Sequence, residues 1–277
     1  MRYDVSSMED FPPGIEEDFA PTSRRRIHWG RGLVLFLGAA YFIIPLYAAL
    51  EFSLQNIQGG FSLQPLTQIA AQSGFGSALW LSAQLAVVTM VLTMVIMVPT
   101  VIYVHLRMPR FRRVMEVITV LPIVIPPIVL VLGVLQASPL WLKSTPYLLA
   151  LVYVVLAMPF VYRSLDAGLG ALDLKTLVEA SRSLGAGTML TTWRVLVPNL
   201  RSALVSASVL TLALVFGEFT VASLDNWTTL PVWIANSSTN DPHIATAVAM
   251  MSLLATAGVL TLIVTLDRSQ TRRIRSN

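Results

Sequence analysis

Long apolar runs separated by short polar segments make up most of the chain after residue 32. A helix that crosses about 30 Å of hydrocarbon needs about 20 mostly apolar residues. Six runs come near or exceed that length: Leu33–Phe52, Ala78–Leu106, Val117–Gln136, Pro146–Tyr162, Ser202–Leu224 and Ile244–Leu266. The pattern therefore predicts an all-α integral membrane protein with six transmembrane helices.

The segment between the first two runs, "QNIQGGFSLQPLTQIAAQSGFGS", contains no Asp, Glu, Lys or Arg. We nevertheless predict a loop there, because Gln, Gly and Ser are too frequent for a membrane-crossing helix. The shortest run, Pro146–Tyr162, leaves one alternative open, a re-entrant segment that enters and leaves on the same side. That alternative would invert the charge asymmetry of every later loop.

The composition agrees with a membrane protein, since 55% of the residues are hydrophobic and 12% are charged. Soluble domains have about 25% charged residues. The basic residues do not form one continuous face, which argues against a nucleic-acid-binding protein. The chain has no cysteine, so neither a disulfide framework nor a thiolate metal site is available.

The distribution of Lys and Arg predicts the orientation, because cytoplasmic loops carry an excess of basic residues. If both termini are cytoplasmic, 18 of the 19 basic residues fall in the inside segments and only Lys143 falls outside. The inside segments are then 1–32, 107–116, 163–201 and 267–277. We therefore expect a six-helix domain over residues 33–266, followed by a basic cytoplasmic tail.

The N-terminal segment 1–32 differs from the rest of the chain. Six of the 15 acidic residues lie between Asp4 and Asp18, and three arginines follow at 24–26. Such a segment cannot bury enough apolar surface to offset the entropy of ordering it. We expect it to be a disordered cytoplasmic segment.

The longest predicted cytoplasmic loop, residues 163–201, has the pattern of two short helices joined by a turn. Asp173 is placed to cap the first helix, and Gly185 suits the left-handed position that ends it. A helical spacing puts four apolar residues of this first helix on one face. They are Leu174, Leu177, Val178 and Leu184.

The second short helix is predicted to begin with Thr188 as its cap and to stop or bend at Pro198. Its apolar residues Met189, Leu190, Trp193, Leu196 and Val197 are expected to cluster. An amphipathic loop of this kind has a plain alternative interpretation, which is a surface helix that packs on its own protein.

Within this loop, Glu179–Pro198 reads "EASRSLGAGTMLTTWRVLVP". It resembles the EAA loop of ABC-importer permeases, in which Glu-Ala-Ala, three residues, Gly, nine residues and Ile-x-Leu-Pro follow one another. Glu179, Gly185 and Pro198 stand at the matching positions. Ser181, together with the valines that replace Ile and Leu before the proline, departs from the pattern with side chains of similar size.

Three further stretches resemble the third, fourth and fifth spans of the spermidine/putrescine branch of this family. They are "LPIVIPPIVLVLGVL" from Leu121, "MPFVYRSLDAGL" from Met158 and "FGEFTVASL" from Phe216. Together with the loop, the resemblance covers most of residues 33–266. It implies a type I ABC-importer transmembrane domain in a bacterial cytoplasmic (inner) membrane.

The resemblance also implies partners and a coupling site. The partners are a second permease subunit, two cytoplasmic ATPase subunits and an extracytoplasmic substrate-binding protein, with the lipid bilayer around the spans. The helix that contains Glu179 is expected to dock in a groove of an ATPase. The implied coupling residues are Leu177, Val178, Glu179, Ala180, Ser181, Arg182, Leu184, Gly185 and Pro198.

ATP hydrolysis is not expected on this chain. A phosphate-binding loop ends in Gly-Lys-Ser or Gly-Lys-Thr, whereas Lys143 and Lys175, the two lysines present, each follow a leucine. The chain is therefore predicted to be a non-catalytic subunit without a cofactor of its own. ATP and Mg²⁺ are expected on the partner ATPases.

Candidate residues of a solute pathway lie in the third and fifth predicted spans. A carboxylate inside a span, such as Glu218, usually faces a cavity or a partner, although a buried structural hydrogen bond is the alternative. Phe216 and Phe219 lie beside it and are candidates for the same route or for simple packing. Pro126 and Pro127 remove main-chain donors and bend the third helix, as a gate or as a plain kink.

The solute is less well defined than the machinery. An acid in the fifth span favours a cationic polyamine such as spermidine or putrescine, with phosphonate, ferric iron, sulfate or molybdate as alternatives. A self-contained secondary transporter or channel is the alternative from another class, but the sequence shows no clear internal repeat. It also lacks the residue groupings of an intramembrane enzyme, and its three histidines have no metal-binding spacing.

Overall fold

The computed structural model describes residues 29–55, 60–61 and 67–275. The expectation of disorder therefore falls almost entirely on residues outside the described part. The chain divides into two units, residues 1–47 and 48–277. Helix α1 (Trp29–Ser53) contains the first predicted span and supplies the described part of the first unit.

Three long apolar helices organise the second unit: α3 (Phe75–Arg107), α7 (Tyr147–Gly170) and α14 (Pro242–Arg275). With α1, they are the four helices of the described chain that are each long and apolar enough to cross a membrane. They match the first, second, fourth and sixth predicted spans. Because α7 is one helix of 24 residues, the re-entrant alternative for its range is not supported.

The third and fifth predicted spans are not single helices. The third consists of α4 (Arg112–Val124), preceded by the short turn η3 (Pro109–Phe111), and of α5 (Pro127–Ala137), which is bent from it by 98°. Six spans result only if each bent pair counts as one crossing. The predicted bend at the prolines is confirmed, and the two helices of the pair cover the predicted range on either side of it.

The fifth predicted span is interrupted near its end. Helix α11 (Arg201–Gly217) stops before Glu218, and a separate short helix, α12 (Thr220–Leu224), follows. At its other end, α11 is bent by 74° from the helical segment Thr188–Asn199. The expected continuous helix over Ser202–Leu224 is therefore wrong, because its polar carboxylate marks a break.

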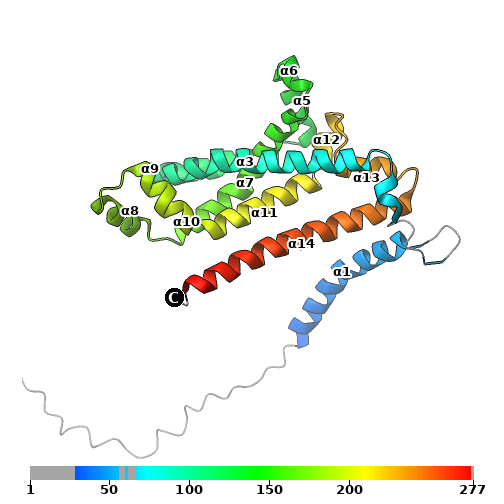
Figure 1. Cartoon of the computed structure of the whole chain (residues 1–277), viewed down its shortest axis with the longest axis horizontal. Coiled ribbons are helices and arrows are strands. Elements are labelled where there is room, and N and C mark those ends of the chain that lie inside the picture. The colour runs from blue at the N-terminus through cyan, green and yellow to red at the C-terminus, as the bar shows by residue number, and fades with distance from the viewer. Residues whose placement is uncertain (1–28, 56–59, 62–66, 276–277) are drawn as a thin grey trace, which may run out of the picture. The chain divides into compact units, whose positions relative to one another are not determined.

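Helices α3, α7 and α11 pack side by side as the core of the second unit (Figure 1). One buried cluster between them contains Leu85, Tyr153 and Val215. A second, nearer the α8 end, contains Val101, Leu165, Leu169, Leu196 and Leu200. The two clusters fix the positions of the loops at both ends of the bundle.

A glycine allows α7 and α11 to approach closely. A Cβ atom at Gly168 would lie 2.5 Å from the Cβ of Ala203 and 3.1 Å from a methyl group of Leu200. Small residues at such contacts are typical of helices that pack within membranes.

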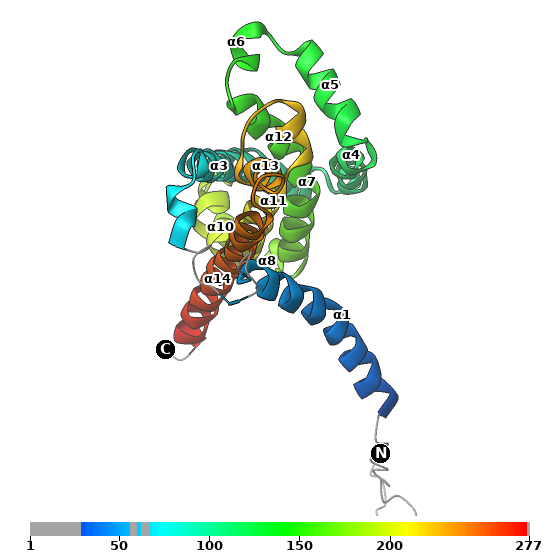
Figure 2. The ribbon, with the colours of Figure 1, turned by 90° about the vertical axis from the view of Figure 1, so that its right-hand side faces the viewer.

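The remaining elements cover the bundle. At one end, η2 (Ile69–Ala71) and α13 (Leu230–Ser237) lie against α3, where Ser82 Oγ accepts a 2.7 Å hydrogen bond from the Leu230 amide. Helix α14 packs along α11 and α13. Helix α5 and the short α6 (Leu140–Lys143) extend away from the bundle as an arm (Figure 2).

Candidate functional site

Helix α8 (Leu174–Ser183) begins with the predicted cap. The Asp173 carboxylate accepts hydrogen bonds from the hydroxyl of Thr176 at 2.7 Å and from its amide at 3.2 Å. These bonds, the hydroxyl first, stabilise the ionised form and lower the pKa of Asp173. The start of the helix is therefore fixed by its own sequence.

The end of α8 is also fixed locally, and the predicted role of Gly185 is confirmed. Gly185 has φ +80°, its amide donates to the Arg182 carbonyl at 2.9 Å, and the Ala186 amide donates to the Ser181 carbonyl at 3.1 Å. This pair of bonds is a Schellman motif, which satisfies the last carbonyls of a helix. A side chain at Gly185 would be strained although nothing stands in its space.

The apolar side of α8 is used within the chain. Leu174 and Leu177 pack against the buried cluster that contains Leu165 and Leu196. Leu184 instead is 88% exposed, so the expectation that it shares their face is wrong. The helix ends at Ser183, and the residue after it no longer follows the helical spacing.

The polar side of α8 is open to solvent. Lys175, Glu179, Ala180 and Arg182 are exposed. Ser181 is buried, and its hydroxyl lies 2.8 Å from the hydroxyl of Thr191. The serine that departs from the Glu-Ala-Ala pattern thus joins α8 to the next helix.

The second short helix differs from the prediction in two ways. Gly187, not Thr188, occupies the cap position of α9 (Thr188–Thr191), without a side-chain capping bond. The expected apolar cluster does not form as a unit. Leu196 is buried, whereas Met189 and Trp193 are 77% and 52% exposed.

The bend before α11 lies where Pro198 predicted it. The chain passes from α9 through one π turn, η4 (Thr192–Leu196), into α10 (Val197–Asn199). The Val195 carbonyl is satisfied by the side-chain amide of Asn199 at 2.7 Å. A proline and a widened turn are both common causes of sharp helix bends.

A cavity of about 350 Å³ separates α8 and α9 from the end of α3. Its charged lining residues are Arg107 from α3 and Lys175, Glu179 and Arg182 from α8. Arg107 spans part of it and donates to the Thr188 hydroxyl at 3.4 Å.

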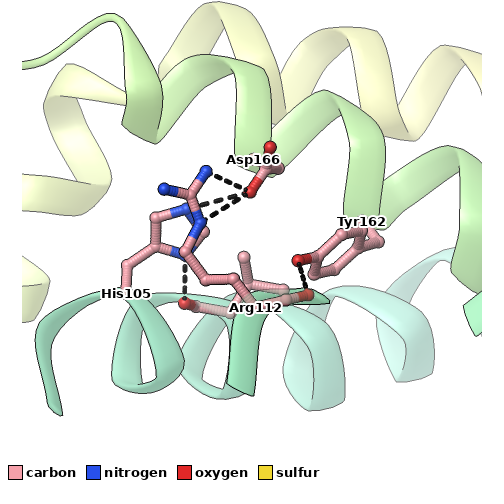
Figure 3. A network of polar contacts seen from close by, with 5 residues as sticks. His105, Arg112, Tyr162 and Asp166 are labelled. Atoms are coloured by element: carbon pink, nitrogen blue, oxygen red, sulfur yellow. Dashed lines mark hydrogen bonds and ion pairs between the residues drawn. The ribbon is translucent and has the colours of Figure 1, made fainter. Parts of the chain in front are cut away.

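A polar cluster that the sequence did not predict borders this cavity through His105; Figure 3 shows its contacts. Asp166 of α7 contacts His105 of α3 and Arg112 of α4 through the same oxygen, Oδ1. The distances are 3.0 Å to His105 Nε2 and 2.8 Å to Arg112 Nη2. The hydroxyl of Tyr162 donates to the Arg112 carbonyl at 2.9 Å.

The His105 ring is almost fully buried, with 3% of its side chain exposed. Its Nδ1 lies 2.9 Å from the Val101 carbonyl, which can only accept, so Nδ1 carries a proton. The Nε2 contact with Asp166 is close but is not aligned as a hydrogen bond. It attracts Asp166 only when Nε2 carries a proton as well.

Sequence reasoning missed this cluster because its members are far apart along the chain. By sequence, Arg112 counts only among the basic residues that predict the orientation, and His105 is one of three histidines without a metal-binding spacing. The available signal was an acid, Asp166, in one predicted cytoplasmic segment and basic residues in the preceding one.

Glu218 lies at the break between α11 and α12, and its carboxylate accepts hydrogen bonds from three groups. The Val221 amide donates at 2.9 Å and 3.1 Å to its two oxygens, and the Ala222 amide donates at 3.4 Å. The hydroxyl of Tyr153 on α7 donates at 3.1 Å. The carboxylate thus caps α12 and ties it to α7, which is the structural alternative named above.

The break between α4 and α5 leaves main-chain carbonyls without their helical hydrogen bonds. Pro126 and Pro127 have no amide hydrogen, so the carbonyls of Pro122 and Ile123 cannot accept the usual helical bond from four residues ahead. Ile125 and the two prolines are exposed. Helix α5 packs against α12, so the two breaks occupy one region of the unit.

The two phenylalanines of the predicted pathway do not act as a pair. Phe216 is partly buried and lines an apolar cavity together with Leu212, Leu230 and Ala255. Phe219 is 42% exposed. Neither the structure around Glu218 nor any other described region groups three His, Asp or Glu side chains in a way that could hold a metal ion.

A comparison with protein families complements this geometry. Residues 99–276 match the family model described as "Binding-protein-dependent transport system inner membrane component". The match covers α4 to α14 and the end of α3, and it therefore includes the α8 loop, the Asp166 cluster and both helix breaks.

Proposed function

The chain belongs to the family of binding-protein-dependent transport system inner membrane components, the permeases of ABC importers, and on this premise we propose that α8 couples it to a cytoplasmic ATPase. Membership makes the chain a multi-pass membrane permease that works with ATPase and binding-protein partners. It also removes the self-contained carrier or channel from consideration.

The observation that carries the coupling proposal is the form of α8. Both of its ends are fixed by local hydrogen bonds, its apolar side is anchored to the chain's own core, and its polar side is exposed. Such a helix moves as a rigid body when a partner binds its exposed side.

The docking surface differs from the one expected from the amphipathic pattern. We assign it to the exposed residues Lys175, Glu179, Ala180 and Arg182, with Leu184 projecting at the end of the helix. Leu174 and Leu177 hold the helix in place from behind. An ATPase groove that receives this surface needs charges complementary to Glu179 and to its basic neighbours.

The solute pathway is proposed to pass the two helix breaks. From Arg112 to Val124 helix α4 rises about 18 Å, and from Asp166 back to Tyr153 helix α7 rises about 20 Å. The two breaks therefore lie at a similar distance from the Asp166 cluster, inside a hydrocarbon layer of about 30 Å. Non-helical backbone at that depth occurs where it lines a cavity or a protein partner.

A polyamine remains the first choice of solute, with an anion or an iron complex as the alternative. The support is the resemblance of the third, fourth and fifth spans to the spermidine/putrescine branch, together with the carboxylate of Glu218 near the break between α4 and α5. Because three donors already share Glu218, the charge available to a cation is smaller than the sequence suggested. Solutes that raise the melting temperature of the partner binding protein identify the class directly.

The coupling proposal is tested by paired glycine variants. Gly185→Ala and Gly187→Ala both place a Cβ in open space, but only Gly185 has a positive φ. A left-handed alanine costs about 1–2 kcal/mol, so Gly185→Ala should weaken ATPase co-purification and binding-protein-stimulated ATP hydrolysis. Gly187→Ala should leave both unchanged.

Reversal of the docking charge gives the stronger test. Glu179→Arg should abolish stimulated ATP hydrolysis and uptake while the protein still inserts. Normal rates in this variant, or labelling of an Arg182→Cys variant by an impermeant reagent from outside the cell, would contradict the proposal.

A further inference from the structure

Helix α8 contacts the rest of the second unit on two of its sides. Leu174 and Leu177 join it to the cluster that contains Leu165 and Leu169 of α7, and Ser181 joins it to Thr191 of α9. Toward α3 it faces the 350 Å³ cavity. A displacement of α8 therefore acts first on α7 and α9, and α7 offers a direct route from there to α4, because the two helices pack against each other.

The contacts of Asp166 provide that connection. Asp166 lies one turn before the end of α7, four residues ahead of Gly170, whereas Arg112 is the first residue of α4 and His105 lies in the last turn of α3. Asp166 Oδ1 thus binds Arg112 at the start of α4 and lies 3.0 Å from His105 Nε2 near the end of α3. We call His105, Arg112 and Asp166 the clamp.

We propose that the clamp is a positioning device that transmits the displacement of α8 through α7 to α4, and so to the break at Ile125 and Pro126. The proposal rests on the proposed docking of α8 to an ATPase. Helix α4 has 13 residues. The clamp binds its first residue, Arg112, and its other end leads into the break between α4 and α5.

A neighbouring ion pair shows why the clamp differs from ordinary surface charges. Arg163 and Glu116 also connect α7 to α4, but their charged atoms are 3.9 Å apart and both side chains are largely exposed. Exposed pairs contribute little. The Asp166 contacts are shorter, one partner is buried, and Arg112 is held a second time through its carbonyl by Tyr162.

The absence of cysteine from the chain permits spin labels at single engineered positions. Labels at Ser183 on α8 and Arg113 on α4, each paired with a reference label at Thr239 beyond the far end of α13, report the two movements separately. The complete importer in lipid nanodiscs is measured without nucleotide and after trapping with ATP and vanadate. In the wild-type background we expect both distances to change.

The decisive variant is Asp166→Asn, and Glu116→Gln is its matched control on the same pair of helices. In Asp166→Asn the Thr239–Ser183 distance should still change on trapping, while the change in Thr239–Arg113 should be lost. Glu116→Gln should behave as the wild type. Asp166→Glu, which keeps the charge, should restore part of the α4 movement.

The outcomes separate this proposal from the one on which it rests. If Ser183 does not move in the wild type, the docking of α8 is wrong. If Ser183 moves but Arg113 does not, or if Arg113 moves equally in Asp166→Asn, the clamp does not transmit the movement of α8 to α4. If Asp166→Asn fails to assemble with the ATPase, and Asp166→Glu assembles without restoring any α4 movement, the charge serves assembly alone and the proposal is overturned.

Discussion

The two helix breaks of the second unit lie in one region, where α5 packs against α12, but are satisfied in opposite ways. At the break between α11 and α12, Glu218 receives the Val221 and Ala222 amides and the Tyr153 hydroxyl. At the break between α4 and α5, two prolines leave the carbonyls of Pro122 and Ile123 without helical donors. One break is closed by the chain itself, whereas the other requires a partner, water or a solute.

This difference indicates that the two breaks have different roles in transport. A self-satisfied break holds its geometry through a transport cycle, since unpaired polar groups in lipid are costly. An open break changes its partners without first losing internal hydrogen bonds. We therefore expect the α11–α12 break to be the fixed side of the pathway and the α4–α5 break to be the moving side.

The largest effect should follow from removal of the closed cap. Glu218→Leu leaves the Val221 and Ala222 amides and the buried Tyr153 hydroxyl unpaired, at about 1–3 kcal/mol for each group. The purified protein should lose most of its thermal stability in detergent. Glu218→Gln keeps an acceptor oxygen and should lose less.

The same pair of variants tests whether Glu218 also serves the solute. Uptake that falls in Glu218→Gln while the melting temperature is nearly unchanged would add a pathway role to the structural one. If Glu218→Leu is as stable as the wild type, the contrast between the breaks is wrong.

The opposite sign is expected at the open break. Pro126→Ala combined with Pro127→Ala supplies two amide donors that a straightened helix would direct at the Pro122 and Ile123 carbonyls. The protein should become more stable to heat while its uptake falls, because the 98° bend is weakened. A variant that is less stable, or that transports normally, would show that the prolines do not hold the break open.

A smaller effect is expected from the contact that holds both breaks in place through α7 and α11. Gly168→Ala places a methyl group 2.5 Å from the Cβ of Ala203, and such overpacking costs about 1–3 kcal/mol. Gly170→Ala, with nothing within 4 Å, is the matched control and should leave the melting temperature unchanged. Equal melting temperatures in the two variants would contradict the close packing.

The smallest effect is expected far from both breaks, at the start of α8. Because the folded-state pKa of Asp173 is lowered, its contribution is present above the unfolded pKa of about 3.9 and is lost as the pH falls through the folded value. Amide protection at Thr176, corrected for intrinsic exchange, should fall only in acid. In Asp173→Ala it should be low at neutral pH also.

The sequence predicted the parts of this structure that depend on neighbouring residues. Four spans follow from uninterrupted apolar length, and both ends of α8 follow from local capping at Asp173 and Gly185. The break at Glu218 was missed because the apolar residues around it resemble those of a continuous span. An acid alone does not reveal that the amides of its own next turn will satisfy it.

Two parts of the candidate site were beyond sequence reasoning for another reason. The amphipathic pattern of α8 identifies an apolar face but not which surface covers it, and Leu174 and Leu177 pack on their own chain. The clamp places His105 next to Asp166, which lies 61 positions later in the sequence. No local pattern encodes such a contact.

The open break between α4 and α5 has a consequence for the lifetime of copies of this subunit that have not assembled. A copy that lacks its assembly partners keeps two main-chain carbonyls without helical donors, one of them on the exposed Ile123, and incompletely satisfied proteins are removed by cellular proteases. Surplus copies should therefore be short-lived, so that the abundance of the finished importer follows the scarcest of its components.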